Sequence, residues 1–173
     1  MDISHDVGML AVRLGIGMIF AAHGVQKLFG WFGGYGLKGT GGFFEGVGFR
    51  PGALFAALAG IGEAGGGLLI ALGFLGPVGA TLAGATMLVA ILTVHLHKGF
   101  FASNGGYEMP LAYGIAGFAI AFAGPGTLSL DYAFGLQGWD GALAAWIGVA
   151  FALVGGLGTL ALRRPVPQVA AKS

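Results

Sequence analysis

Five long apolar runs dominate the chain, and each is close to the length of a membrane-spanning helix. A helix needs about 20 residues to cross a hydrocarbon core of about 30 Å. The fourth run is the shortest, because it stops at Gly124-Pro125-Gly126. The pattern predicts an all-α transmembrane bundle with five spans, near residues 7–26, 51–73, 77–97, 109–125 and 141–162.

The basic residues fall in alternate segments between these runs. Seven of the eight Lys and Arg follow the first, third and fifth runs: Lys27, Lys38, Arg50, Lys98, Arg163, Arg164 and Lys172. The remaining segments carry Asp2, Asp6, Asp131 and Asp140 instead. Because cytoplasmic loops are enriched in Lys and Arg, we expect a multi-pass inner-membrane protein with its N-terminus outside and its C-terminus in the cytoplasm.

Composition agrees with a membrane protein and narrows the possible chemistry. Charged residues make up 9% of the chain, against about 25% in soluble domains, and the mean hydropathy is +0.86. The chain has no cysteine, which excludes disulfides, thiolate metal sites and dithiol redox chemistry within it. A net charge of +1 without a basic patch argues against nucleic-acid binding. Neither a nucleotide nor a haem site is expected.

Glycine is the second unusual feature, with 37 residues. In membrane helices small residues allow close backbone approach, and the second run carries one such face. This face predicts tight packing on neighbouring helices, although a chance stripe is the alternative in so glycine-rich a chain. Its members are Ala56, Ala59, Gly60, Glu63, Gly66 and Gly67. The aromatic and glycine-rich segment 30–44 is interpreted as a loop at the membrane interface.

Ionisable residues inside the runs mark the candidate sites. Counted from the outer helix ends, Arg13 and Glu63 lie at depths that a long arginine side chain can bridge. They are predicted to pair in the outer half of the membrane. The pair either neutralises two charges and fixes helix register, or serves as a proton or substrate site.

A second cluster lies near the cytoplasmic end of the first and third runs: His23, Lys27, His95 and His97. One interpretation is that these side chains extend toward the interface. The other is a site for a quinone headgroup or a proton relay, because imidazole can donate hydrogen bonds to carbonyl oxygens. His95 and His97 point about 200° apart on a helix, so no metal site is expected there.

Several of these residues stand in motifs that resemble the DoxX family of membrane proteins. The resemblance covers about residues 9–132, and its motifs agree in order and spacing: Arg13-Leu14-Gly15, His23-Gly24-x-Gln26-Lys27-Leu28-Phe29-Gly30, Gly62-Glu63-x-x-Gly66-Gly67, Asn104-Gly105-Gly106-Tyr107-Glu108 and Gly124-Pro125-Gly126-x-x-Ser129-Leu130-Asp131. It implies a compact bundle of four membrane helices. Some members are linked to the membrane part of a thiosulfate:quinone oxidoreductase, or to redox-stress complexes.

The fifth run departs from the family pattern. We therefore expect a four-helix DoxX-like domain over 1–132, an additional transmembrane helix within 133–162 and a disordered cytoplasmic tail over 163–173. Three functions remain open: a membrane subunit of a quinone-linked oxidoreductase, a small proton-coupled transporter using Glu63, and a non-catalytic scaffold. In the first, quinone is the expected cofactor and redox proteins are the partners that carry the electrons. Each of the three functions is also compatible with an oligomer.

Overall fold

The computed structural model describes residues 3–139 and 141–164, and every regular element among them is helical. The predicted all-α class is confirmed. Asp2, Asp140, Lys172 and the predicted tail from 165 onward lie outside the described residues. The main helices are α1 (Ile3–Phe29), α2 (Gly36–Gly46), α3 (Gly52–Leu72), α4 (Val78–Ala90), α5 (Glu108–Ala123), α6 (Leu130–Ala133) and α7 (Ala142–Ala161). Short turns are η1 (Trp31–Gly33), η2 (Ile91–His95), η3 (Leu96–Lys98), η4 (Ala102–Asn104) and η5 (Gln137–Trp139).

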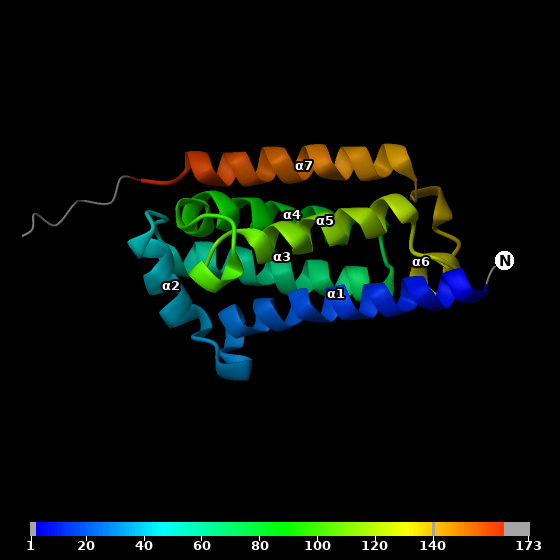
Figure 1. Cartoon of the computed structure of the whole chain (residues 1–173), viewed down its shortest axis with the longest axis horizontal. Helices are drawn as coiled ribbons and strands as arrows, with labels where there is room; N and C mark the ends of the chain where they lie inside the picture. The colour runs from blue at the N-terminus through cyan, green and yellow to red at the C-terminus, as the bar shows by residue number, and fades with distance from the viewer. Residues whose placement is uncertain (1–2, 140, 165–173) are drawn as a thin grey trace, which may run out of the picture.

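Within the described part of the chain, four helical segments are long and apolar enough to cross a membrane. They are α1, α3, the continuous stretch Val78–Lys98 and α7. The fourth predicted run forms α5, whose 16 residues extend about 24 Å and fall short of a full span. It nevertheless runs beside the others, and each long helix reverses the direction of the one before it (Figure 1). The chain is therefore a multi-pass membrane bundle.

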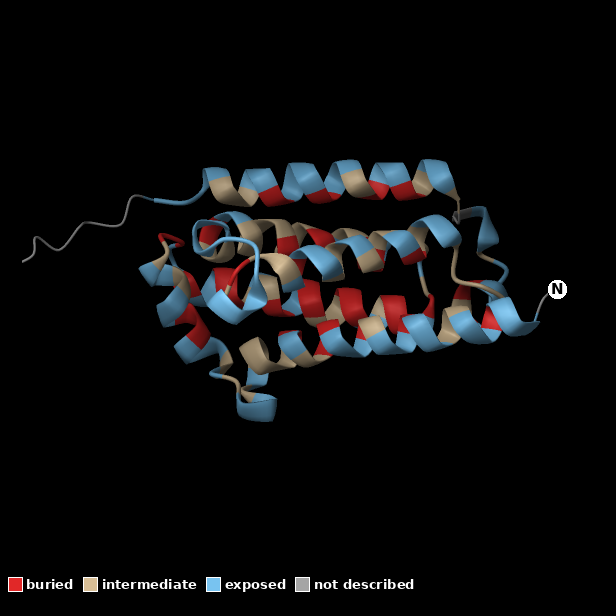
Figure 2. Ribbon diagram, in the orientation of Figure 1, coloured by how far each residue is buried: buried red, intermediate tan, exposed pale blue. Residues whose placement is uncertain are grey.

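The bundle has a core of four helices and one outer helix. In the core, α1 packs on α3, α3 on α4, α4 on α5, and α5 back on α1. The additional helix α7 packs on α4 and α5 and forms one side of the molecule (Figure 1). Much of α7 is exposed (Figure 2), and its exposed residues include the apolar Leu143 and Val154. Such side chains suit contact with lipid acyl chains.

Glycine brings α1 and α3 into backbone contact. A Cβ built on Gly67 would lie 2.5 Å from the Gly17 carbonyl oxygen, and one on Gly24 would lie 2.6 Å from that of Gly60. No side chain fits at these points, so the two helices are held in one register. Gly66 makes a similar approach to Gly79 of α4. The predicted packing face of α3 is confirmed, and it serves two neighbours.

The segment predicted as a loop contains a helix. Residues 36–46 form α2, which packs on α3 and α1. Glycines weaken helix propensity, which is why the pattern suggested a loop, but tertiary contacts outweigh this. The rings of Phe44, Phe49 and Phe55 pack in sequence, with centroids 5.8 and 5.0 Å apart, and the Glu45 carboxylate accepts the Gly52 N–H at 3.1 Å. These contacts fix α2 at the end of the bundle where α3 begins.

Candidate functional site

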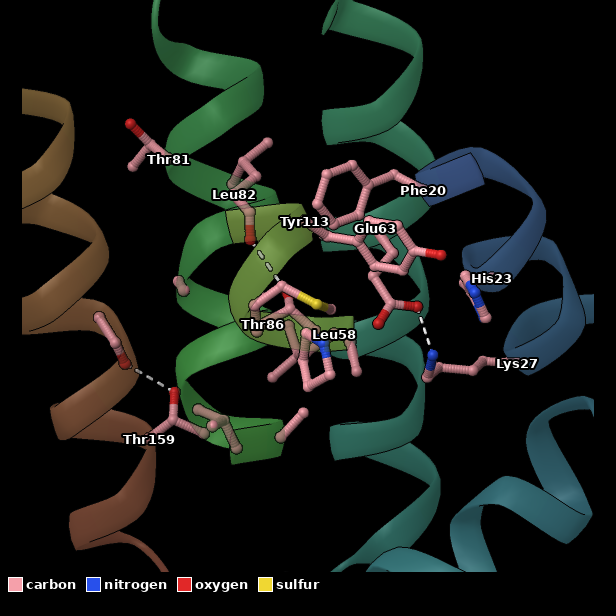
Figure 3. A pocket seen from close by; sticks show the side chains of 18 of the residues that line it. Phe20, His23, Lys27, Leu58, Glu63, Thr81, Leu82, Thr86, Tyr113 and Thr159 are labelled. Atoms are coloured by element: carbon pink, nitrogen blue, oxygen red, sulfur yellow. Dashed lines mark hydrogen bonds and ion pairs between the residues drawn. The ribbon is translucent and has the colours of Figure 1, made fainter. Parts of the chain in front are cut away.

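A cavity of about 1110 Å³ runs through the bundle. Its walls come from α1, α2, α3, α4, α5 and α7. Pockets for drug-sized ligands usually measure about 300–1,000 Å³, so this space exceeds what one small headgroup needs. Most of its lining is apolar. The ionisable side chains of His23, Lys27 and Glu63 gather on the side formed by α1 and α3 (Figure 3).

An ion pair between Lys27 and Glu63 marks that polar side. The Lys27 ammonium donates to a Glu63 carboxylate oxygen, as Figure 3 shows. The Glu63 side chain is 3% exposed and that of Lys27 is 25% exposed. A helical side chain leans toward the N-terminus of its helix, and this direction carries the Lys27 ammonium up to the level of Glu63. The carboxylate thus keeps a counter-charge inside an apolar bundle.

His23 and Tyr113 stand beside this pair. Phe20, His23 and Lys27 follow the three- and four-residue spacing that puts them on one face of α1. The Tyr113 ring of α5 lies against both Phe20, at a centroid distance of 5.9 Å, and His23, at 6.3 Å. All four residues line the cavity. The polar side therefore combines an ammonium, a carboxylate, an imidazole and a phenol.

His95 reaches the cavity from a π-helical turn. The α4 helix changes to the π-helix Ile91–His95, a distortion that is frequent at functional sites. Its Nδ1 lies 2.7 Å from the Gly105 carbonyl oxygen. Because a carbonyl only accepts, Nδ1 carries the proton, and Nε2 of the neutral ring is an acceptor. Donation from His95 to a ligand then requires a ring with a proton on both nitrogens, and it stays a prediction. His97 is exposed and is not part of the cavity lining.

Threonines in the cavity wall do not add donors to it. Each hydroxyl donates to the carbonyl oxygen four residues earlier on its own helix. The distances are 3.0 Å for Thr81 and Thr86, 2.7 Å for Thr93 and 2.8 Å for Thr159. These donors are already used, so the walls formed by α4 and α7 present mainly hydrocarbon to a ligand.

The predicted pair between Arg13 and Glu63 is not formed, because Glu63 binds Lys27 instead. The glycine contacts explain the error. Since Gly17 lies against Gly67 and Ala71, Arg13 one turn earlier is level with Gly73, ten residues beyond Glu63. That offset is about 15 Å along the helix. Depths counted from helix ends missed it, because α1 extends beyond the end of α3.

Arg13 instead holds the opposite end of the bundle together. It is 1% exposed, and its Nη2 donates to the Leu128 carbonyl oxygen. The fully buried Asp131 supplies the negative charge that acts on it. Asp131 also accepts the N–H groups of Leu75 at 2.8 Å and Gly76 at 2.7 Å, which fixes the turn between α3 and α4. Arg13 therefore lies at the opposite end of the bundle from the polar side of the cavity, where it holds neighbouring segments together.

A small space of about 20 Å³ adjoins Arg13. The Nε and Nη1 atoms of Arg13 have no hydrogen-bond partner among residues 3–139 and 141–164. A space of this size holds one water molecule, which would satisfy these donors. Across the same described residues, no three His, Cys, Asp or Glu side chains converge as metal ligands.

Sequence reasoning singled out four of the polar residues that line the cavity: His23, Lys27, Glu63 and His95. It missed Tyr113, which stands in the fourth apolar run like any interfacial aromatic. The available signal was its position one turn after Pro110, near the basic end of the bundle, where the other candidates also lie. It also gave no sign that α7 contributes a wall, because the α7 lining residues are apolar or small.

Comparison with known proteins identifies the family of this chain. The sequence model of the DoxX family matches residues 8–96, which cover most of α1 and all of α2, α3, α4 and the π-helical turn. The chain is also 31% identical over 131 residues to a Bacillus subtilis (strain 168) protein described as "Putative oxidoreductase CatD", across 76% of this chain and 90% of that protein. No solved structure matches the chain. With its multi-pass bundle and this family match, the chain belongs to the DoxX family of membrane proteins.

Proposed function

We propose that this protein is a membrane subunit of a quinone-linked oxidoreductase and that its cavity binds the quinone. The proposal rests on one observation. Four polar side chains lie together on one side of a large, otherwise apolar cavity: Lys27, Glu63, His23 and Tyr113. Pockets with a few convergent polar groups in an apolar wall are typical of small-molecule binding. The description of the Bacillus relative as an oxidoreductase supports the same class.

The polar residues divide into donors and acceptors. Lys27 has three N–H donors, and its bond to Glu63 uses one of them. His23 can also donate to a carbonyl oxygen of the ligand. Glu63 and Nε2 of neutral His95 accept, so they suit hydroxyl protons. A quinone takes up two electrons, here from a partner redox protein, together with two protons at its carbonyl oxygens.

Binding of a soluble quinone analogue to the purified chain tests the proposal. We expect His23→Ala to weaken binding about tenfold, which corresponds to the loss of one hydrogen bond of about 1.4 kcal/mol. His97→Ala is the matched control and leaves the affinity unchanged, because His97 is exposed and outside the cavity lining. No binding to the wild type, or equal affinity in the His23→Ala variant, contradicts the proposal.

The proposed orientation places the N-terminus outside the inner membrane. Alternation of the helices brings the described basic residues other than Arg13 to the end of the bundle where α1 ends (Figure 1), and this end is assigned to the cytoplasm. We expect green fluorescent protein fused to the C-terminus to fluoresce and alkaline phosphatase fused there to be inactive. An active phosphatase fusion contradicts the orientation.

A further inference from the structure

The wall that α7 adds to the cavity is long and continuous. Ala144, Ile147, Phe151, Gly155 and Thr159 all line the space, and their spacing of three or four residues puts them on one helix face. From Ala144 to Thr159 this face extends about 22 Å. Figure 3 shows Thr159 across the cavity from Lys27 and His23. The cavity therefore has a polar side and a long apolar extension.

This extension opens sideways between α3 and α7. The outer helix packs on α4 and α5 rather than on α3. At the end of the bundle where α7 ends, two hydrogen bonds bridge the gap. The Arg164 backbone N–H donates to the Gly48 carbonyl oxygen at 2.8 Å. The Arg163 Nε donates to the Val47 carbonyl oxygen at 2.6 Å. Higher along the bundle, Leu58 of α3 and Phe151 of α7 line the cavity yet are 55% and 66% exposed. Lining residues that are also exposed mark an opening, and in a membrane bundle it faces acyl chains.

We infer that the ligand is an amphiphile, namely a quinone whose hydrocarbon tail lies along α7 and which moves in from the bilayer between α3 and α7. The inference rests on the proposed function, since it places the headgroup beside Lys27 and Glu63. A water-soluble ligand would leave the apolar extension without a role. A tail fits it, because the threonine hydroxyl protons there are already bonded within their helices.

Gly155 allows a steric test. It lines the cavity, and a Cβ added there meets nothing within 4 Å, so Gly155→Phe adds a ring at the wall of the extension without a clash. Gly158 of the same helix also has open space around it, but it is not part of the lining. Gly158→Phe is therefore the matched control. A phenylalanine at either position is compatible with the helix.

The measurement uses the purified full chain in detergent with two probes that share one benzoquinone headgroup. One probe has no tail and the other has a ten-carbon tail. We expect Gly155→Phe to weaken binding of the tailed probe at least tenfold and to leave the tailless probe unchanged, while Gly158→Phe changes neither. Because a tail in a micelle is already out of water, the deciding quantity is the change between variants, not the difference between probes in the wild type.

Photolabelling provides a readout that needs no variant. A tailed quinone with a diazirine at the end of its tail should label α7 peptides of the wild type, and excess unlabelled tailed probe should suppress the labelling. If the tailless probe binds but Gly155→Phe leaves the tailed probe unaffected, or α7 remains unlabelled, the inference about the tail is wrong and the proposed function stands. If neither probe binds to the wild type, both are wrong.

Discussion

Replacing Asp131 by Ala should lower the free energy of unfolding by about 3–5 kcal/mol, the loss typical when a buried charge loses its partner. The change removes the negative charge that acts on the buried Arg13. It also removes the acceptor of the partly buried hydrogen bonds from the Leu75 and Gly76 N–H groups, and each lost bond adds to the cost. Thermal or denaturant unfolding in detergent measures the loss.

Glu108→Ala is the control for this prediction. Its carboxylate also accepts a backbone N–H, that of Ala102 at 2.8 Å, but at an exposed position. Solvent can replace that acceptor, so we expect a loss below about 1 kcal/mol. Asp131→Asn should fall between the two, because it keeps an acceptor oxygen and loses the charge. Equal losses in Asp131→Ala and Glu108→Ala would show that Asp131 does not act as a buried anchor.

Lys27→Met should destabilise the protein more than Glu63→Gln. Removal of Lys27 leaves the Glu63 carboxylate, 3% exposed, without a counter-charge, at a cost of about 3 kcal/mol. Removal of the Glu63 charge leaves Lys27, which is 25% exposed and can extend its ammonium toward the interface. We therefore expect a loss of about 1.5 kcal/mol for Glu63→Gln.

A double-mutant cycle separates the pair from other effects. The double variant of Lys27 and Glu63 should lose clearly less stability than the two single variants combined, since they share one interaction. The same cycle for Arg13→Gln and Glu63→Gln should be additive within about 0.5 kcal/mol, because the two residues are offset by about 15 Å along the bundle. Coupling of Arg13 to Glu63, or additivity of Lys27 and Glu63, would contradict the observed pairing.

The fold was predictable because its main signals are local. Apolar runs of membrane-spanning length indicated the long helices, and the alternation of charged segments indicated their alternating directions. The small-residue face on α3 was also visible, since a helical spacing of Gly60, Gly66 and Gly67 needs no tertiary information. The α2 helix was not predictable, because contacts among Phe44, Phe49 and Phe55 outweigh the poor helix propensity of its glycines.

The candidate site was predictable in composition but not in pairing. His23, Lys27, Glu63 and His95 stood out because ionisable residues are costly inside apolar runs. Which of them meet depends on how far α1 slides along α3, and backbone contacts such as Gly17 with Gly67 set that shift. Sequence patterns give the facing residues of a helix but not its offset against a neighbour. The same limit explains why Arg13 was assigned to Glu63 instead of the end of the bundle.

The backbone contact between α1 and α3 has a mechanical consequence. At these contacts the two helices meet through backbone atoms and small side chains, which leave little room to rearrange, so we expect α1 and α3 to move together. On the far side of the cavity, α7 is held by side chains of α4 and α5 and by the hydrogen bonds of Arg163 and Arg164 at one end. Side-chain contacts are more compliant than backbone contacts. We therefore expect the cavity to widen by tilting of α7 about its anchored end, while α1 and α3 keep the geometry of Lys27 and Glu63.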